Sequence, residues 1–233
     1  MKKRAVIIHW LIDYVSFTKG ILLGYLYADA PHNYQPRTHT LKPPVILLAG
    51  LAERWGFLKT IGDFIAKNNY PVYIVPKLKS NFKTVSESAA IINEIIEKNN
   101  LKNVIILGHS KGGTIGKYML LHHNQKERII GVIAIATPFK GTLLCKIFPH
   151  KAYNEFIPQS QLIQNLQRNI KHNQKIISIA PQWDNHIWPQ NGSYLEGAEN
   201  IKLTINGHHR ILFHKELQRI ILYSLEKLTK KQV

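Results

Sequence analysis

The sequence predicts an α/β protein with a mostly parallel central sheet and helices on both of its faces. Short, wholly apolar segments alternate with segments that carry apolar residues at helical spacing. No internal repeat or low-complexity tract interrupts this alternation. Apolar runs without polar interruption are typical of strands that are covered on both faces, as in a parallel sheet. A length of 233 residues suits a single domain of this kind.

The expected elements follow one another from residue 44 to the carboxyl end. Strands are expected at six short apolar runs, residues 45–49, 72–75, 103–107, 130–136, 176–180 and 201–205. Helices are expected where apolar residues recur every three or four positions, over residues 58–65, 85–96, 112–123 and 214–228. Residues 139–170 show neither pattern, so we expect an irregular insertion there and treat it as a candidate lid over the carboxyl edge of the sheet.

The composition of the chain excludes several classes of protein. With 45% hydrophobic and 19% charged residues, the chain is too apolar to be disordered and too charged to be a polytopic membrane protein. Cys145 is the only cysteine, which excludes an internal disulfide and a structural zinc site with two or more thiolates. The net charge of +17 indicates an anionic partner, and the charge alone does not choose between a nucleic acid and an acidic membrane.

Residues 1–30 are largely apolar, with a basic start. Small residues at 28–30 suit cleavage of a signal peptide, but Asp13 and Lys19 interrupt the apolar run and argue against it. The alternative is an amphipathic helix that either packs on the domain or lies in a membrane interface. Its apolar set would be Ile7, Leu11, Tyr14, Val15, Ile21, Leu22 and Tyr25, and its headgroup contacts would be Lys2, Lys3, Arg4 and Lys19. These alternatives stay open, and residues 31–233 are expected to form one domain.

The segment Gly108-His109-Ser110-Lys111-Gly112 matches the pattern G-x-S-x-G. It lies between the apolar run 103–107 and an expected helix, at a turn that would expose the serine hydroxyl above the sheet. A sharp turn needs small flanking residues, and Gly108 and Gly112 supply them. The spacing excludes a phosphate-binding loop, because Lys111 precedes the last glycines instead of following them. We therefore predict that Ser110 is a nucleophile.

A serine nucleophile needs a carboxylate that orients its histidine partner. Strand-to-helix nucleophiles of this kind have the chain order Ser, acid, His, and Asp184 is the one aspartate of four that follows Ser110. Asp184 comes shortly after an expected strand, at the edge of the sheet where the site must lie. Glu196 and Glu199 are alternatives, and a purely turn-forming role in Asp184-Asn185 is the structural alternative.

The base is expected on the loop that follows the last strand, where His208 and His209 are adjacent. His208 is favoured because it directly follows Gly207, but spacing alone leaves both histidines open. His186 lies two residues from Asp184 and is expected to line the pocket.

Two backbone N–H groups should stabilise the negative charge that develops on the substrate oxygen. We expect them from Lys111, directly after the nucleophile, and from Leu51, where Gly50 allows a close approach of the backbone. The Lys111 side chain is expected to point to solvent. The residues expected to support the site are Gly50, His109, Gly112, His186 and His209. No metal ligand is expected among these residues.

With Ser110, Asp184 and His208 in this order, the chain resembles α/β hydrolases of the lipase-like branch and is similar to small bacterial lipases and related bacterial hydrolases. The resemblance covers most of the chain, and its specific segments are residues 48–55, 108–113, 136–142, 183–189 and 207–212. It implies an α/β-hydrolase fold, and the Gly-His of the last segment implies that His208 is the base. The chain departs from such lipases at Ala49-Gly50, where they carry His-Gly, and at Lys111, where many carry an uncharged residue.

The first functional hypothesis is therefore a serine esterase or lipase that cleaves a carboxylic ester, with a lipid-like ester favoured by the apolar amino terminus, the tryptophans and the basic surface. An acyltransferase that uses the same serine is the second, because the triad does not select the acyl acceptor. The third is a basic binding protein without catalysis. No cofactor and no nucleic-acid partner are expected. The expected location is the cytoplasm, with peripheral contact to an anionic membrane.

Overall fold

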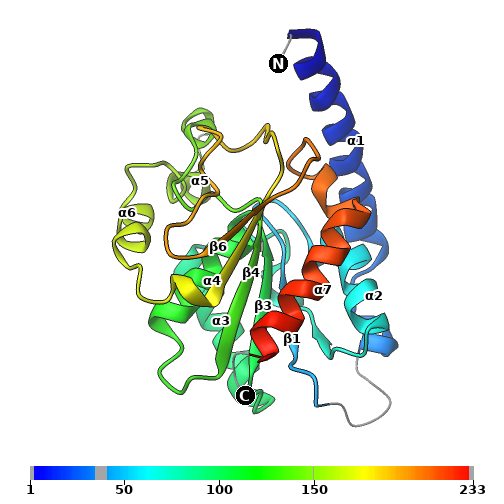
Figure 1. Cartoon of the computed structure of the whole chain (residues 1–233), viewed down its shortest axis with the longest axis vertical. Helices are drawn as coiled ribbons and strands as arrows, with labels where there is room; N and C mark the ends of the chain where they lie inside the picture. Colours follow the sequence, from blue (N-terminus) through cyan, green and yellow to red (C-terminus); the bar gives the residue numbers. More distant parts are fainter. Residues whose placement is uncertain (1–2, 35–40, 149, 231–233) are drawn as a thin grey trace.

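The computed structural model describes residues 3–34, 41–148 and 150–230. Its centre is a six-stranded sheet in the order β2-β1-β3-β4-β5-β6, and every neighbouring pair is parallel. Helices cover both faces of this sheet (Figure 1). The predicted fold class, a mostly parallel sheet between helical layers, is thereby confirmed.

The strands match the predicted apolar runs, with shorter strands at the two edges. Their bounds are β1 Val45–Leu48, β2 Val72–Tyr73, β3 Val104–His109, β4 Ile129–Ile135, β5 Ile176–Ala180 and β6 Glu199–Lys202. The central strands β1, β3 and β4 are buried along their whole length, whereas β6 alternates between partly buried and exposed residues. The edge position of β6 explains why it is shorter and more polar than predicted.

Seven α-helices surround the sheet: α1 Lys3–Leu26, α2 Lys59–Lys67, α3 Val85–Lys98, α4 Lys111–His122, α5 Lys151–Asn154, α6 Gln161–Arg168 and α7 Lys215–Lys230, among the described residues. Short 3₁₀ helices join them: η1 His32–Tyr34, η2 Trp55–Leu58, η3 Pro76–Leu78, η4 Leu143–Ile147, η5 Asn173–Lys175 and η6 Arg210–Phe213. The predicted irregular insertion at 139–170 contains η4, α5 and α6. Of these, α5 lies beyond the carboxyl ends of the strands and α6 lies to one side of the sheet (Figure 1).

Two hydrophobic cores lie on the two faces of the sheet, because side chains alternate along each strand. Val45 and Leu47 of β1 point to a core shared with α2 and α7, whereas Ile46 and Leu48 point to a core shared with α3 and α4. The sheet is therefore covered on both faces, and the exposed rim at its carboxyl edge is left for a site.

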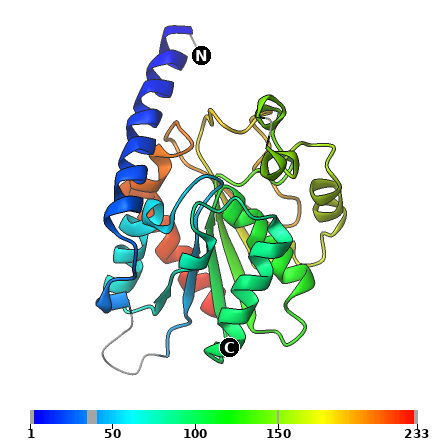
Figure 2. The ribbon, with the colours of Figure 1, turned by 180° about the vertical axis from the view of Figure 1, so that it is seen from behind.

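The amino-terminal helix α1 lies against the α2 and α7 side of the domain, and its first half rises beyond the sheet (Figures 1 and 2). It contacts the domain through η2 and η6. The buried side chain of Asp13 and the buried Gly20 and Gly24 form the contact face, whereas the predicted apolar set of this helix is exposed. Lys2 and the side chains of Lys3 and Arg4, expected at lipid headgroups, lie outside the described part of the chain.

Candidate active site

Ser110 lies at the turn between β3 and α4. Its backbone has φ 51° and ψ −117°, a sparsely populated conformation for a residue with a side chain. Its N–H donates to the carbonyl oxygen of Ile135 in β4 at 2.8 Å. The turn is thereby fixed to the neighbouring strand, and Ser110 is held at the carboxyl edge of the sheet.

Glycines make this turn possible because other backbone atoms approach them closely. A Cβ on Gly108 would lie 2.2 Å from the carbonyl carbon of Gly112, and a Cβ on Gly112 would lie 2.1 Å from the carbonyl oxygen of Leu48. Both contacts are with backbone, which cannot move aside. The glycines that the sequence analysis singled out are therefore required by the geometry of the turn.

His208 and Asp184 form a hydrogen-bonded pair near this edge. Nδ1 of His208 lies 3.0 Å from Oδ1 and 2.9 Å from Oδ2 of Asp184, and both side chains are buried. Because an ionised carboxylate can only accept, Nδ1 carries the proton. In the neutral ring the free lone pair is then on Nε2, the nitrogen that can accept a proton from a hydroxyl.

The Asp184 carboxylate is oriented by the turn that it begins. Its Oδ1 accepts the N–H groups of His186 at 2.7 Å and Ile187 at 3.0 Å, which is the hydrogen-bond pattern of an Asx turn. Gln190 donates to the Asp184 carbonyl oxygen at 2.6 Å and accepts the Asp184 N–H at 2.8 Å. The turn-forming alternative and the acid role are thus compatible, since one carboxylate serves both.

The pKa values of this pair suit proton transfer. Burial lowers the pKa of His208 below its ordinary value of 6.5, although the charge and hydrogen bond of Asp184 act in the opposite direction. Burial would raise the pKa of Asp184, but the His208 charge and hydrogen bond outweigh it and the pKa of Asp184 is lowered. At neutral pH the pair therefore consists of a neutral imidazole and an ionised carboxylate.

A cavity of about 400 Å³ has both Ser110 and His208 in its wall. This volume is in the range of small-molecule sites. The rest of the wall is mainly apolar and comes from α1, the loop after β1, the segment after β4 and the loop before β6: Trp10, Tyr14, Phe17, Leu51, Ala52, Pro138, Leu144, Cys145, Ile147, Phe148, Tyr153, Phe156 and Ile187. The insertion at 139–170 thus supplies one wall of the cavity.

The two residues expected to donate backbone N–H groups, Leu51 and Lys111, both line this cavity. Lys111 is the first residue of α4, where a backbone N–H has no partner within the helix. The loop of Leu51 is fixed by Gly50, whose N–H donates to Oε2 of Glu53 at 2.6 Å.

The expectation that the Lys111 side chain points to solvent is wrong. This side chain is buried, and its Nζ donates to the carbonyl oxygens of Asn81, at 2.9 Å, and of Lys83. Burial lowers the pKa of Lys111 to about 8. The loop at 81–83 passes over the start of α4 and offers two carbonyl acceptors, so the long side chain joins this loop to the turn of Ser110.

A second layer of buried charge lies behind His208. Nδ1 of His109 is 2.9 Å from Oε2 of Glu53, and Nε2 of His109 is 3.0 Å from the carbonyl oxygen of His208. His109 thus connects the turn of Ser110 to the loop of His208.

Asp13 of α1 is fully buried against the same loop. It accepts the N–H groups of His209 at 2.7 Å and Arg210 at 2.9 Å, and it also binds Nδ1 of His209 and the side-chain amide of Asn185, each at 2.9 Å. Asn185 in turn accepts the N–H of His208 at 2.9 Å. The amino-terminal helix therefore fixes the backbone on which His208 lies.

His209 lies between two carboxylates and is not paired with Asp184. Its Nδ1 binds Asp13, and its Nε2 lies 3.5 Å from Oε1 of Glu53. Burial would lower the pKa of His209, but the hydrogen bonds to Asp13 and Glu53 overcome it and raise this pKa to about 9. Burial would raise the pKa values of Asp13 and Glu53, and their histidine partners lower both. His209 is therefore a buried imidazolium at neutral pH.

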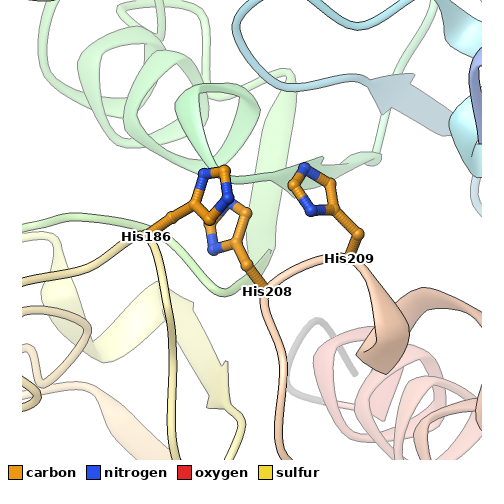
Figure 3. Close-up of side chains that lie close together, drawn as sticks. All are labelled: His186, His208 and His209. Atoms are coloured by element: carbon orange, nitrogen blue, oxygen red, sulfur yellow. The ribbon is translucent and has the colours of Figure 1, made fainter. Parts of the chain in front are cut away.

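Three histidine rings meet at this point, and Figure 3 shows His186 against His208 with His209 beside them. The rings of His186 and His208 are stacked, with centroids 4.7 Å apart and an angle of 7° between the planes. Burial, with the charges of the other two histidines, lowers the pKa of His186 to about 3. His186 also lines the cavity, as expected.

One ring nitrogen from each of these three histidines lies within 4.8 Å of the other two, a spacing that could suit a metal ion. A metal ligand needs a free lone pair, however, and both nitrogens of protonated His209 carry protons that face Asp13 and Glu53. Nδ1 of His208 is likewise directed at Asp184. The cluster therefore fits a hydrogen-bonded network better than a metal centre.

The sequence analysis missed the structural importance of Asp13, Glu53 and Asn185. Asp13 was interpreted only as an interruption of an apolar segment, yet a single acidic residue in an otherwise apolar helix is itself a signal of a buried partner. Asp13 lies 196 residues from His209 in the sequence, so no local pattern could have joined them.

A family model described as the alpha/beta hydrolase fold matches residues 21–159, which include Ser110 and end before Asp184 and His208. No curated protein matches the chain.

Among solved structures, the mature form of the lipase BlEst2 from Bacillus licheniformis is similar with a TM-score of 0.66 and 16% identity, covering 82% of this chain and 95% of that one. The α/β hydrolase MGS-MChE2, from a metagenome of lagoon sediments at Mar Chica, Morocco, has a TM-score of 0.61 and 18% identity over 82% of this chain and 93% of that one. A structure from a study of carboxylesterases of the thaumarchaeon Nitrososphaera gargenis has a TM-score of 0.60 and 14% identity, covering 82% and 92%.

At these identities the structural matches establish the fold alone. The family model, in contrast, covers more than half of the sequence, including the strand, turn and helix around Ser110. The chain belongs to the alpha/beta hydrolase fold family.

Proposed function

We propose that this protein is a serine hydrolase that cleaves carboxylic esters with apolar acyl chains through an acyl-enzyme on Ser110. The observation that carries the proposal is the position of His208. Its Nδ1 is bound to the buried Asp184 carboxylate, and its ring shares one apolar cavity with Ser110. This is the arrangement that a hydroxyl nucleophile needs.

In the first half of the proposed reaction, the Ser110 Oγ attacks the ester carbonyl carbon while Nε2 of His208 accepts the hydroxyl proton. The carbonyl oxygen becomes an oxyanion, which binds the backbone N–H groups of Leu51 and Lys111, two residues that line the cavity. When the intermediate collapses, the C–O bond to the alcohol breaks and His208 gives its proton to the departing oxygen. Asp184 holds the ring and stabilises the imidazolium between these steps.

In the second half, a water molecule loses a proton to His208 as it attacks the acyl-enzyme. The acid product leaves, and His208 returns the proton to Ser110. Hydrogen bonds to the backbone of His208 limit how far this residue can move during the cycle. The N–H of His208 donates to Asn185 and its carbonyl oxygen accepts from His109, so its backbone is fixed on both sides.

The cavity favours an apolar acyl group over a charged one. Aromatic side chains of α1 and of the insertion form much of its wall, and Cys145 in this wall is an un-ionised thiol because burial raises its pKa to about 12. Apolar area removed from water contributes about 25 cal/mol per Å². Each added methylene of the acyl chain should therefore improve kcat/KM until the cavity is filled.

The direct test is hydrolysis of nitrophenyl esters from acetyl to long acyl chains by the wild type and by Ser110→Ala. We expect wild-type kcat/KM to rise from short to medium chains and Ser110→Ala to lose activity by a factor of at least about 10³. The matched control is Ser86→Ala, an exposed serine on α3, which should retain wild-type kinetics.

Two results would contradict the proposal. One is equal ester hydrolysis by the wild type and Ser110→Ala, which would place the chemistry elsewhere. The other is accumulation of a transfer product, with no free acid, when an alcohol is added, which would make the protein an acyltransferase.

A further inference from the structure

Helix α1 exposes a row of aliphatic side chains and buries a carboxylate, which is the reverse of the usual orientation of a surface helix. On most surface helices the apolar stripe faces the core and the polar residues face water. On α1 the carboxylate of Asp13 is buried, whereas Ile7, Leu11, Val15, Leu22 and Leu26 are 57% to 70% exposed. These five residues, spaced by four and seven positions, form a single line along the helix, which we call the outward stripe.

The packing of α1 fixes this orientation. Gly20 lies so close to η2 that a Cβ there would be 2.4 Å from the ring of Phe57. Gly24 approaches the backbone of Gly56, and Asp13 is bound by two backbone N–H groups of the His208 loop. A rotation of α1 that buried the outward stripe would break all of these contacts and leave the Asp13 charge without partners.

We propose that the outward stripe of α1 docks on the surface of an anionic membrane, with its aliphatic side chains among the acyl chains. The residues Val6–Leu26 are long and apolar enough to cross a bilayer by length and composition. Because Asp13, Gly20 and Gly24 hold the helix against the domain, only one side of α1 is free for lipid, and the contact is peripheral.

The surface charge favours lipid over a second copy of the chain. Each chain has a net charge of +17, so two copies repel one another, whereas an anionic leaflet attracts each of them. Lys19 is exposed beside the stripe, but its Nζ lies over the Phe213 ring of η6, 4.5 Å from the centroid, so the attraction rests on the net charge of the chain.

A second exposed group has the same character, and two of its members, Ile147 and Phe148, line the cavity. Phe82, Ile147 and Phe148 are 42%, 70% and 41% exposed, and the exposed Lys83 and Lys146 are their neighbours in the sequence. The amino-terminal half of α1 and the segment around α5 rise at the same end of the molecule (Figures 1 and 2). Tyr14 connects α1 to this second group, because it lies on α1 and lines the same cavity as Ile147 and Phe148.

The test is flotation of the purified full chain with phosphatidylcholine vesicles, prepared with or without phosphatidylglycerol. We expect binding to the anionic vesicles, weaker binding to the neutral ones, and a loss of at least about tenfold in the partition coefficient for Leu11→Gln/Leu22→Gln. The matched control is Leu41→Gln/Ile170→Gln, which changes two exposed aliphatic residues outside α1 and should bind like the wild type.

This experiment does not depend on ester hydrolysis, and Ser110→Ala should float like the wild type. Circular dichroism and the unfolding midpoint verify that the Leu11→Gln/Leu22→Gln variant is folded. Equal partitioning of this folded variant and the wild type would overturn the proposal. So would a stable wild-type dimer in analytical ultracentrifugation that the same variant dissociates, because the stripe would then cover a second copy.

Discussion

At the scale of single side chains, buried ionisable residues hold His208 in position. Asp13 and Glu53 are the anions. His209 lies between them, and His109 binds Glu53 and the carbonyl oxygen of His208. An unpaired buried charge costs several kcal/mol, so each of these groups depends on the others for its own stability. This mutual dependence makes the loop of His208 rigid, which a general base requires.

The protonation of His208 gives a prediction for activity. Because the pKa of His208 is lowered below 6.5 by burial, the imidazole stays neutral in mildly acidic solution. We expect the acidic limb of the kcat/KM profile on a neutral ester to have its midpoint below pH 6.5. A midpoint at or above pH 7 in this assay would mean that another group limits the reaction or that the ring is more solvated.

Replacement of Asp13 tests the support of the base from α1. Asp13→Asn keeps the shape but removes the charge that pairs with His209. We expect a loss of about 2 to 4 kcal/mol in the free energy of unfolding and a fall of about tenfold in kcat with little change in KM. Asp29→Asn, at an exposed position, is the control. If both variants behaved alike, the buried network would have no role in positioning His208.

At the scale of elements, the contact between α1 and η2 is unusual because it is made through glycine. Alanine normally favours a helix over glycine by about 1 kcal/mol. At Gly20 an added methyl group would meet the Phe57 ring, so we expect Gly20→Ala to destabilise the protein by about 1 to 3 kcal/mol instead.

The measurement for Gly20→Ala is the unfolding midpoint together with proteolysis of α1. Thr18→Ala, on the exposed side of the same helix, is the matched control and should leave the midpoint unchanged or slightly higher. A higher midpoint for Gly20→Ala would show that α1 is not packed against η2 as described.

The elements could largely be predicted from the sequence because parallel strands are uniformly apolar and the helices between them are periodic. The triad candidates could be predicted because one motif fixes the nucleophile and the chain order then leaves few partners. The burial of Lys111 could not, since its acceptors are carbonyl groups of a loop about 30 residues away. The face of α1 that packs on the domain could not be predicted either, because Gly20, Gly24 and Asp13 carry no hydrophobic signal and Phe17 is one aromatic residue among many apolar ones.

At the scale of the whole molecule, the buried network links stability to pH. The pKa of His209 is about 9 in the folded protein against 6.5 when unperturbed. Its imidazolium therefore stabilises the fold fully below pH 6.5, and this contribution is lost as the pH rises through 9. Lys111 and Lys117 have lowered pKa values of about 8, so their buried charges destabilise the fold at lower pH, and this cost is relieved as the pH rises through 8.

This linkage predicts a difference between variants. Between pH 6.5 and 8, the stability that the wild type has over Asp13→Asn should shrink by on the order of 1 to 2 kcal/mol. Charge effects common to both proteins cancel in this difference. Thermal unfolding of both variants at each pH gives the measurement, and a gap that stays constant or widens over this range would contradict a buried imidazolium at His209.

The central claim is that Ser110 is an activated nucleophile, and labelling with a fluorophosphonate probe tests it most directly. The probe forms a covalent bond only with a hydroxyl whose proton a nearby base can accept. We predict a single labelled peptide that contains Ser110, with labelling abolished in Ser110→Ala and strongly slowed in His208→Ala. Folded wild-type protein that takes up no label, or a label on another residue, would contradict the account.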